Sequence, residues 1–64
     1  MHTREQITEK AKEILDSNPS TRGLGLCLDL IEEAQRAETL EEGAQIIVDD
    51  SLYWAGFFHG VPGI

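Results

Sequence analysis

The amino-acid sequence predicts an all-α fold: a compact three-helix bundle made by one small domain over residues 1–64. Three observations predict it. Apolar residues recur three and four positions apart along most of the chain, which is the spacing of one helix face. Two Thr-x-x-Gln/Glu tetrads have the form of helix capping boxes. A break at Asp16–Ser20, which contains Pro19, separates two of the periodic stretches.

Residues 3–17 are predicted to form the first helix. Thr3 followed by Gln6 is a capping box, in which each side chain satisfies a backbone N–H group of the other residue. The apolar residues at helical spacing fall on one face: Ile7, Ala11, Ile14 and Leu15. A row of acidic residues, Glu5, Glu9 and Glu13, occupies another face and is expected to be solvated.

A second helix is predicted over residues 19–37. Asn18 would be its N-cap and Pro19 its first residue, a position that tolerates proline. Residues 24–30 also alternate in a way that is compatible with a strand. We favour the helix because the strongly helix-forming stretch EEAQRAE follows with no turn between them. Gly23 and Gly25 weaken a helix here, or delay its start to about Leu24.

Residues 39–58 are predicted to form the third and central helix, with Thr39 and Glu42 as its capping box. One side of this helix carries the residues expected to face the core: Leu40, Ala44, Ile47, Val48, Ser51, Trp54, Ala55 and Phe58. A second apolar stripe carries Ile46, Tyr53 and Phe57. Gly60 is placed to end the helix, and Pro62 prevents its continuation.

All the aromatic residues lie in the last third of the chain: Tyr53, Trp54, Phe57 and Phe58. They form two pairs with i, i+4 spacing on adjacent faces of the third helix. Together with the aliphatic residues they are more apolar surface than one three-helix core can cover. We therefore expect at least one pair to contact a partner, which would be a second copy in a homodimer or higher oligomer, or another protein.

A second candidate binding surface is acidic. Seven carboxylates span the end of the second helix, the following turn and the outer face of the third helix, opposed only by Arg36: Glu32, Glu33, Glu38, Glu41, Glu42, Asp49 and Asp50. Such a field could imitate nucleic-acid phosphates and occupy a basic surface of another protein. The simpler interpretation is a solvated face.

Charge also limits the classes of partner. Twelve acidic residues against five basic ones give a net charge of −7, which argues against direct binding of nucleic acid or of an anionic membrane. Neither a secretory h-region nor a transmembrane-length apolar run is present, and a single cysteine makes a reducing cytoplasm the expected compartment.

No residue pattern in the sequence predicts catalysis, a cofactor or a metal site. Cys27 lies among leucines and is expected to pack in the core, because a nucleophilic cysteine needs a base and a lowered pKa. Glu32, Glu33 and His59 do not have the spacing of metal ligands in helical bundles. An enzymatic or metal site that forms only across subunits stays a remote alternative.

We therefore expect a non-enzymatic, small acidic protein that acts by protein–protein binding. The sharper hypothesis is an inhibitor or regulator that occupies a basic surface of a nucleic-acid-handling complex. In size, acidity and lack of catalytic residues the chain is similar in kind to small phage-encoded inhibitors such as the anti-CRISPR proteins, a likeness that rests on no shared motif. The alternative is a structural homo-oligomer subunit or adaptor whose aromatic helix face forms the interface.

Overall fold

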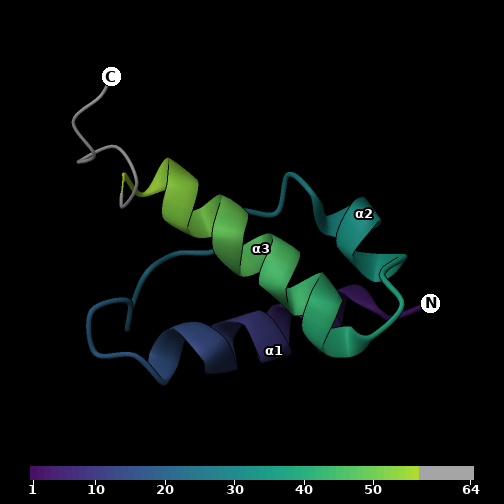
Figure 1. Ribbon diagram of the computed structural model, residues 1–64, viewed down its shortest axis with the longest axis horizontal. Helices are drawn as coiled ribbons and strands as arrows, with labels where there is room; N and C mark the ends of the chain where they lie inside the picture. Colours follow the sequence, from purple (N-terminus) through teal and green to yellow (C-terminus); the bar gives the residue numbers. More distant parts are fainter. Residues whose placement is uncertain (57–64) are drawn as a thin grey trace.

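Three helices form the fold of the computed structural model, which describes residues 1–56 (Figure 1). Helix α1 spans Arg4–Asp16, α2 spans Ile31–Gln35 and α3 spans Leu40–Trp54. The long helices α1 and α3 pack against each other, and the short α2 lies beside the N-terminal half of α3. The all-α prediction is confirmed for the described residues, which contain no strand.

Both predicted capping boxes are present. The Thr3 and Thr39 hydroxyls accept the backbone N–H groups of Gln6 and Glu42 at 3.0 and 3.1 Å. The Gln6 and Glu42 side chains accept the N–H groups of Thr3 and Thr39 in return, at 2.9 and 3.3 Å. At the start of each long helix, capping side chains therefore accept backbone N–H groups that have no partner within the helix.

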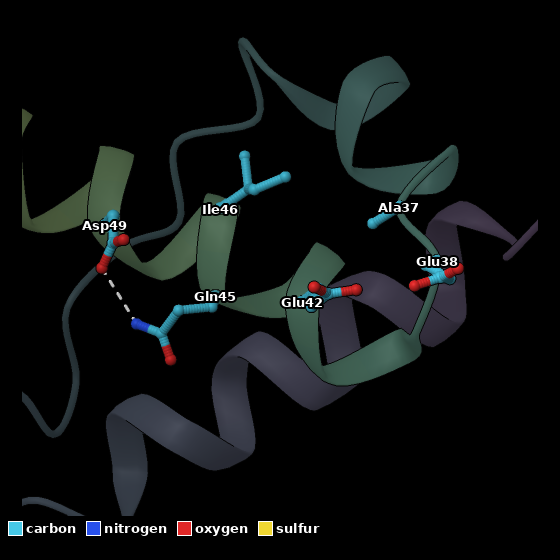
Figure 2. A pocket seen from close by; sticks show the side chains of 6 residues that line it. All are labelled: Ala37, Glu38, Glu42, Gln45, Ile46 and Asp49. Atoms are coloured by element: carbon cyan, nitrogen blue, oxygen red, sulfur yellow. Dashed lines mark hydrogen bonds between the residues drawn. The ribbon is translucent and has the colours of Figure 1, made fainter.

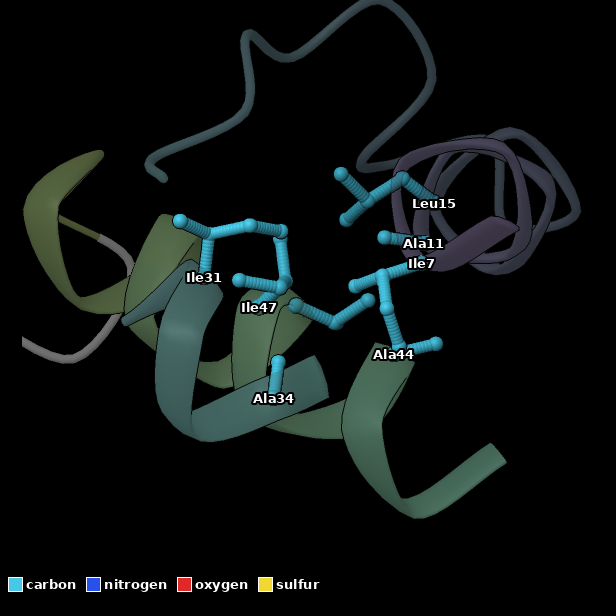
Figure 3. Packing of buried hydrophobic residues seen from close by; sticks show 8 residues of the cluster. Ile7, Ala11, Leu15, Ile31, Ala34, Ala44 and Ile47 are labelled. Carbon is cyan, nitrogen blue, oxygen red and sulfur yellow. The ribbon is translucent and has the colours of Figure 1, made fainter. Parts of the chain in front are cut away.

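The core lies where the three helices meet. Its side chains point toward a common centre in Figure 3, and its members are Ile7, Ala11, Leu15, Ile31, Ala34, Ala44, Ile47 and Val48. The predicted core faces of α1 and α3 are confirmed at these positions. Small residues at 11, 34 and 44 let the helices approach closely, which suits a chain too short for a large core.

Gly43 has a packing role that its effect on helix propensity does not reveal. It is buried, and a methyl group built on it would meet the carbonyl oxygen of Ala34 and, at 2.6 Å, the Cδ1 atom of Ile7. Helix α3 therefore contacts both α1 and the backbone of α2 at a position that only glycine can occupy without displacement of its neighbours.

The predicted second helix is wrong over most of its length: α2 has five residues where residues 19–37 were expected. Asn18 does not cap a helix, because its Oδ1 atom accepts the backbone N–H of Ser20 in a local turn at 3.0 Å. Gly23 then adopts a φ of +86°, which no right-handed helix contains. Residues 24–28 follow in an irregular conformation, neither helix nor strand.

The third helix ends four residues earlier than predicted. Trp54 is its last residue and Ala55 its C-cap, and Gly56 takes the left-handed conformation, with φ of +89°, that often follows a helix end. The terminating role was assigned to Gly60, which lies outside the described residues, as do Phe57 and Phe58.

Helix α2 is tied to the start of the chain. The His2 backbone N–H donates to the Gln35 carbonyl oxygen at 3.0 Å, and the Gln35 amide Nε2 donates to the His2 carbonyl oxygen at 3.0 Å. This reciprocal pair joins residues 33 positions apart and fixes the C-terminal end of α2 beside the start of α1.

Candidate functional site

Helix α3 presents opposite faces to the core and to solvent. Its buried residues are Gly43, Ala44, Ile47, Val48 and Ser51. On the opposite side, Glu42, Ile46, Asp49 and Tyr53 are spaced four, three and four residues apart, so they form one stripe along the helix. We call these four residues the outer stripe.

A shallow hollow of about 520 Å³ lies between the outer stripe and the linker that follows α2. It is lined by Ala37, Glu38, Glu42, Gln45, Ile46 and Asp49, and we call it the acidic hollow. Figure 2 shows Ala37 and Ile46 pointing toward the same space, with Glu38 and Glu42 at one end and Gln45 and Asp49 at the other. The floor is thus apolar and the two ends carry carboxylates.

Two of the three carboxylates of the hollow, Glu42 and Asp49, have neutral hydrogen-bond partners. The Glu42 Oε1 atom accepts the Thr39 N–H, and the Asp49 Oδ1 atom accepts the Gln45 amide Nε2–H at 2.9 Å. The ion pairs of residues 1–56 lie elsewhere, between Lys10 and Glu13 at 3.1 Å and between Arg36 and Glu32 at 4.0 Å. No basic side chain of the described part therefore forms an ion pair with the carboxylates of the hollow.

The structure brings only part of the predicted acidic surface together. Glu38, Glu42 and Asp49 line the hollow, whereas Glu32, Glu33 and Glu41 are exposed outside it. Asp50 was predicted to lie on the outer face of the third helix, but it does not. It is half-buried, and it accepts a hydrogen bond from the thiol of Cys27, with an Sγ–Oδ2 distance of 2.9 Å.

The two described aromatic residues lie at the end of α3. Tyr53 is 48% exposed and Trp54 is 64% exposed, and their rings meet edge to face with centroids 5.2 Å apart. Trp54 was assigned to the core side of the helix. It is exposed because the last turn of α3 extends beyond α2, which covers only the first half of the helix (Figure 1).

A second polar cluster attaches residues 24–28 to α3. The buried Ser51 hydroxyl accepts the Cys27 N–H at 2.8 Å and donates to the Ile47 carbonyl oxygen at 2.6 Å. The hydrogen bond to Asp50 raises the pKa of the Cys27 thiol, because losing the proton would remove that bond and place two anions side by side. Cys27 is thus half-buried in a polar contact, not packed in the core as predicted.

Cys27, Asp29 and Asp50 are the described residues whose donor atoms could hold a metal ion, since these atoms lie within 4.8 Å of one another. Sequence reasoning missed this group, because Asp50 lies 21 positions from Asp29 and 23 from Cys27, and the three residues share no motif. The protonated thiol and its bond to Asp50 already account for the contact between α3 and residues 24–28. We assign the group a structural role.

No helix within residues 1–56 has the length and apolar character needed to cross a membrane. Comparisons of the chain with protein families, with curated proteins and with solved structures find no match.

Proposed function

We propose that this chain acts by binding another protein that presents a basic surface, and that the acidic hollow and the outer stripe of α3 form the contact. The observation that carries the proposal is the combination in one hollow of an apolar floor and three carboxylates, none of which forms an ion pair within residues 1–56. Charged groups at the rim of an interface steer association, and the apolar centre supplies the contact that holds the complex.

Within this class, the sharper proposal is an inhibitor or regulator of a nucleic-acid-handling complex. A net charge of −7 on 64 residues gives the chain a long-range attraction to surfaces that otherwise bind phosphates. Carboxylates at both ends of the hollow can engage the same lysine and arginine side chains. Binding of this protein and binding of nucleic acid would then be mutually exclusive.

The test uses two variants that remove equal charge from different faces. Glu38→Gln, Glu42→Gln and Asp49→Asn together neutralise the hollow, and Gln at position 42 keeps the capping box. Glu5→Gln, Glu9→Gln and Glu13→Gln neutralise the exposed row on α1 as the matched control. Each immobilised protein is used to capture partners from lysate at low and at high salt.

We expect the natural chain and the α1 variant to capture one basic protein that the hollow variant does not capture. High salt should weaken this binding. Addition of the natural chain should then displace labelled duplex DNA from the captured protein, measured by fluorescence anisotropy. Equal capture by both charge variants would refute a role for the hollow, and DNA that stays bound would refute the inhibitor hypothesis.

A second candidate function is a structural homo-oligomer or adaptor, which the exposed Tyr53–Trp54 pair favours. Tyr and Trp are enriched in interface hot spots, and Trp54 is two-thirds exposed. Light scattering over a range of concentrations tests it. A fixed oligomer that dissociates after Tyr53→Ala and Trp54→Ala supports the homo-oligomer, whereas a monomer at every concentration excludes it and leaves only the adaptor.

A further inference from the structure

The acidic hollow has a polarity pattern that repeats along α3. Glu42 and Asp49 are seven residues apart, which is two turns of helix or roughly 10.5 Å, and Ile46 lies between them. Figure 2 shows the Ile46 side chain directed into the hollow toward Ala37, with the carboxylates of Glu42 and Asp49 on either side. A complementary surface needs two cations about two turns apart and an aliphatic side chain between them.

Both carboxylates keep capacity for such cations. Each oxygen of a carboxylate offers two lone pairs, so the pair of oxygens can accept about four hydrogen bonds. Glu42 uses Oε1 for the Thr39 backbone and hydroxyl, and Asp49 uses Oδ1 for Gln45. The remaining oxygens of these two residues have no hydrogen-bond partner in the described part of the chain.

Backbone geometry decides between a helix and an extended segment as the occupant. The outer stripe belongs to a helix, whose backbone groups bond within the helix, so an incoming strand finds no edge to pair with. An extended peptide laid over Ala37 and Ile46 would therefore bury its own N–H and C=O groups without partners, which is costly. A helix satisfies these groups internally and contacts the hollow with side chains alone.

We infer that the partner docks a cationic amphipathic helix in the acidic hollow, with Lys or Arg at positions i and i+7 and an aliphatic residue at i+3 or i+4. The cations pair with Glu42 and Asp49, and the aliphatic side chain packs on Ile46 and Ala37. This inference rests on the proposed function, because it specifies what the same surface recognises.

The test is a titration of the 15N-labelled full chain with designed peptides, followed by heteronuclear NMR. The first peptide has about 18 residues, a crosslink on its outer face to hold the helix, and the inferred pattern of two lysines and a leucine. A second has the same composition with the lysines moved to opposite faces. A third has the inferred pattern with a proline at its centre, which breaks the helix.

We expect the patterned helix to bind about tenfold more tightly than the other two peptides at low salt, since two exposed ion pairs together account for about that factor. The largest amide shifts should fall on Ala37, Ile46 and Asp49. Glu42→Gln with Asp49→Asn should abolish the tenfold preference, and Glu5→Gln with Glu9→Gln should leave it unchanged.

The other outcomes are distinguishable. Equal, salt-sensitive binding of all three peptides at the hollow would overturn the inferred helix and leave the proposed function intact. Equal binding of the proline and patterned peptides, with weaker binding of the permuted one, would overturn the helical conformation of the occupant. If no peptide shifts any residue of the hollow, both the inference and the proposed role of this surface are wrong.

Discussion

The two long helices and the segment that joins α1 to α2 are held in place in different ways. Helices α1 and α3 begin at capping boxes, in which the bonded residues are three positions apart. Residues 17–30 contain local turns, but bonds that reach further attach them to the helices: the Thr21 hydroxyl donates to the Leu15 carbonyl at 2.6 Å, and Cys27 bonds to Ser51 and Asp50 of α3. The helices are thus specified locally, and the segment is specified by a fold that must already exist.

The two regions also differ in how tightly they pack. Where α1, α2 and α3 meet, contact is close enough to require glycine at position 43. Along residues 24–28 the leucines at 24, 26 and 28 are only half-buried. The segment is held to α3 by the buried hydroxyl of Ser51, which accepts the Cys27 N–H. An added side-chain atom between the helices should therefore lower the stability of the helical core. Loss of a hydrogen bond should instead loosen residues 24–28.

The largest expected effect comes from Gly43→Ala. The added methyl group meets a backbone oxygen of α2, which cannot rotate away, so we expect a loss of about 2–3 kcal/mol in the free energy of unfolding, even after alanine's gain in helix propensity. Urea denaturation measures it. Gly25→Ala is the control, because nothing lies within 4 Å of its added Cβ and its cost should stay below about 0.5 kcal/mol. Equal costs at both positions would contradict the close contact.

A smaller loss, about 1–2 kcal/mol, is expected for Ser51→Ala, which leaves the Cys27 N–H without its partner. Hydrogen exchange should rise at Cys27 and its neighbours and stay nearly unchanged at the centre of α1, because the segment can open without the long helices. Ser17→Ala is the matched control, since its hydroxyl is exposed. Uniform acceleration of exchange in every element would show that the segment and the helices unfold as one unit.

The smallest effect is a pH dependence at Cys27. A raised pKa means that the thiol's contribution to stability is complete below the ordinary cysteine pKa of about 8.5 and is lost as the pH rises through the raised value. Thiolate absorbance should therefore titrate at higher pH in the natural chain than in Asp50→Asn. Asp49→Asn, one residue away and bonded to Gln45, should not move the titration. Identical titration curves for all three proteins would show that the hydrogen bond between the Cys27 thiol and Asp50 does not form in solution.

The sequence was sufficient to locate the two long helices. Capping boxes at Thr3 and Thr39, and apolar residues at 7, 11, 44 and 47 in helical register, depend only on near neighbours, and the structure confirms them. The segment could not be predicted in the same way. Its strand-like alternation is compatible with the side-by-side leucines at 24, 26 and 28, but the helix-forming stretch EEAQRAE that follows favours a helix. The hydrogen bond that fixes the segment instead comes from Ser51, 24 positions away from Cys27, and leaves no local signal in the sequence.

The candidate site was predictable in composition and not in arrangement. Glu38, Glu42 and Asp49 were among the acidic residues identified from the sequence, and they meet at the hollow because the linker after α2 folds along α3. Asp50, adjacent to Asp49, could not be separated from it by sequence alone. One residue turns a helix position by about 100°, which moves Asp50 toward Cys27.

The reciprocal hydrogen bonds between His2 and Gln35 have a consequence for the order in which the helices form. A five-residue helix does not form in isolation, because nucleation costs more than so few hydrogen bonds return. Helix α2 is instead fixed at one end by the start of the chain and along its buried side by α3. We therefore expect the docked pair α1–α3 to form first during folding and α2 to condense on it afterwards.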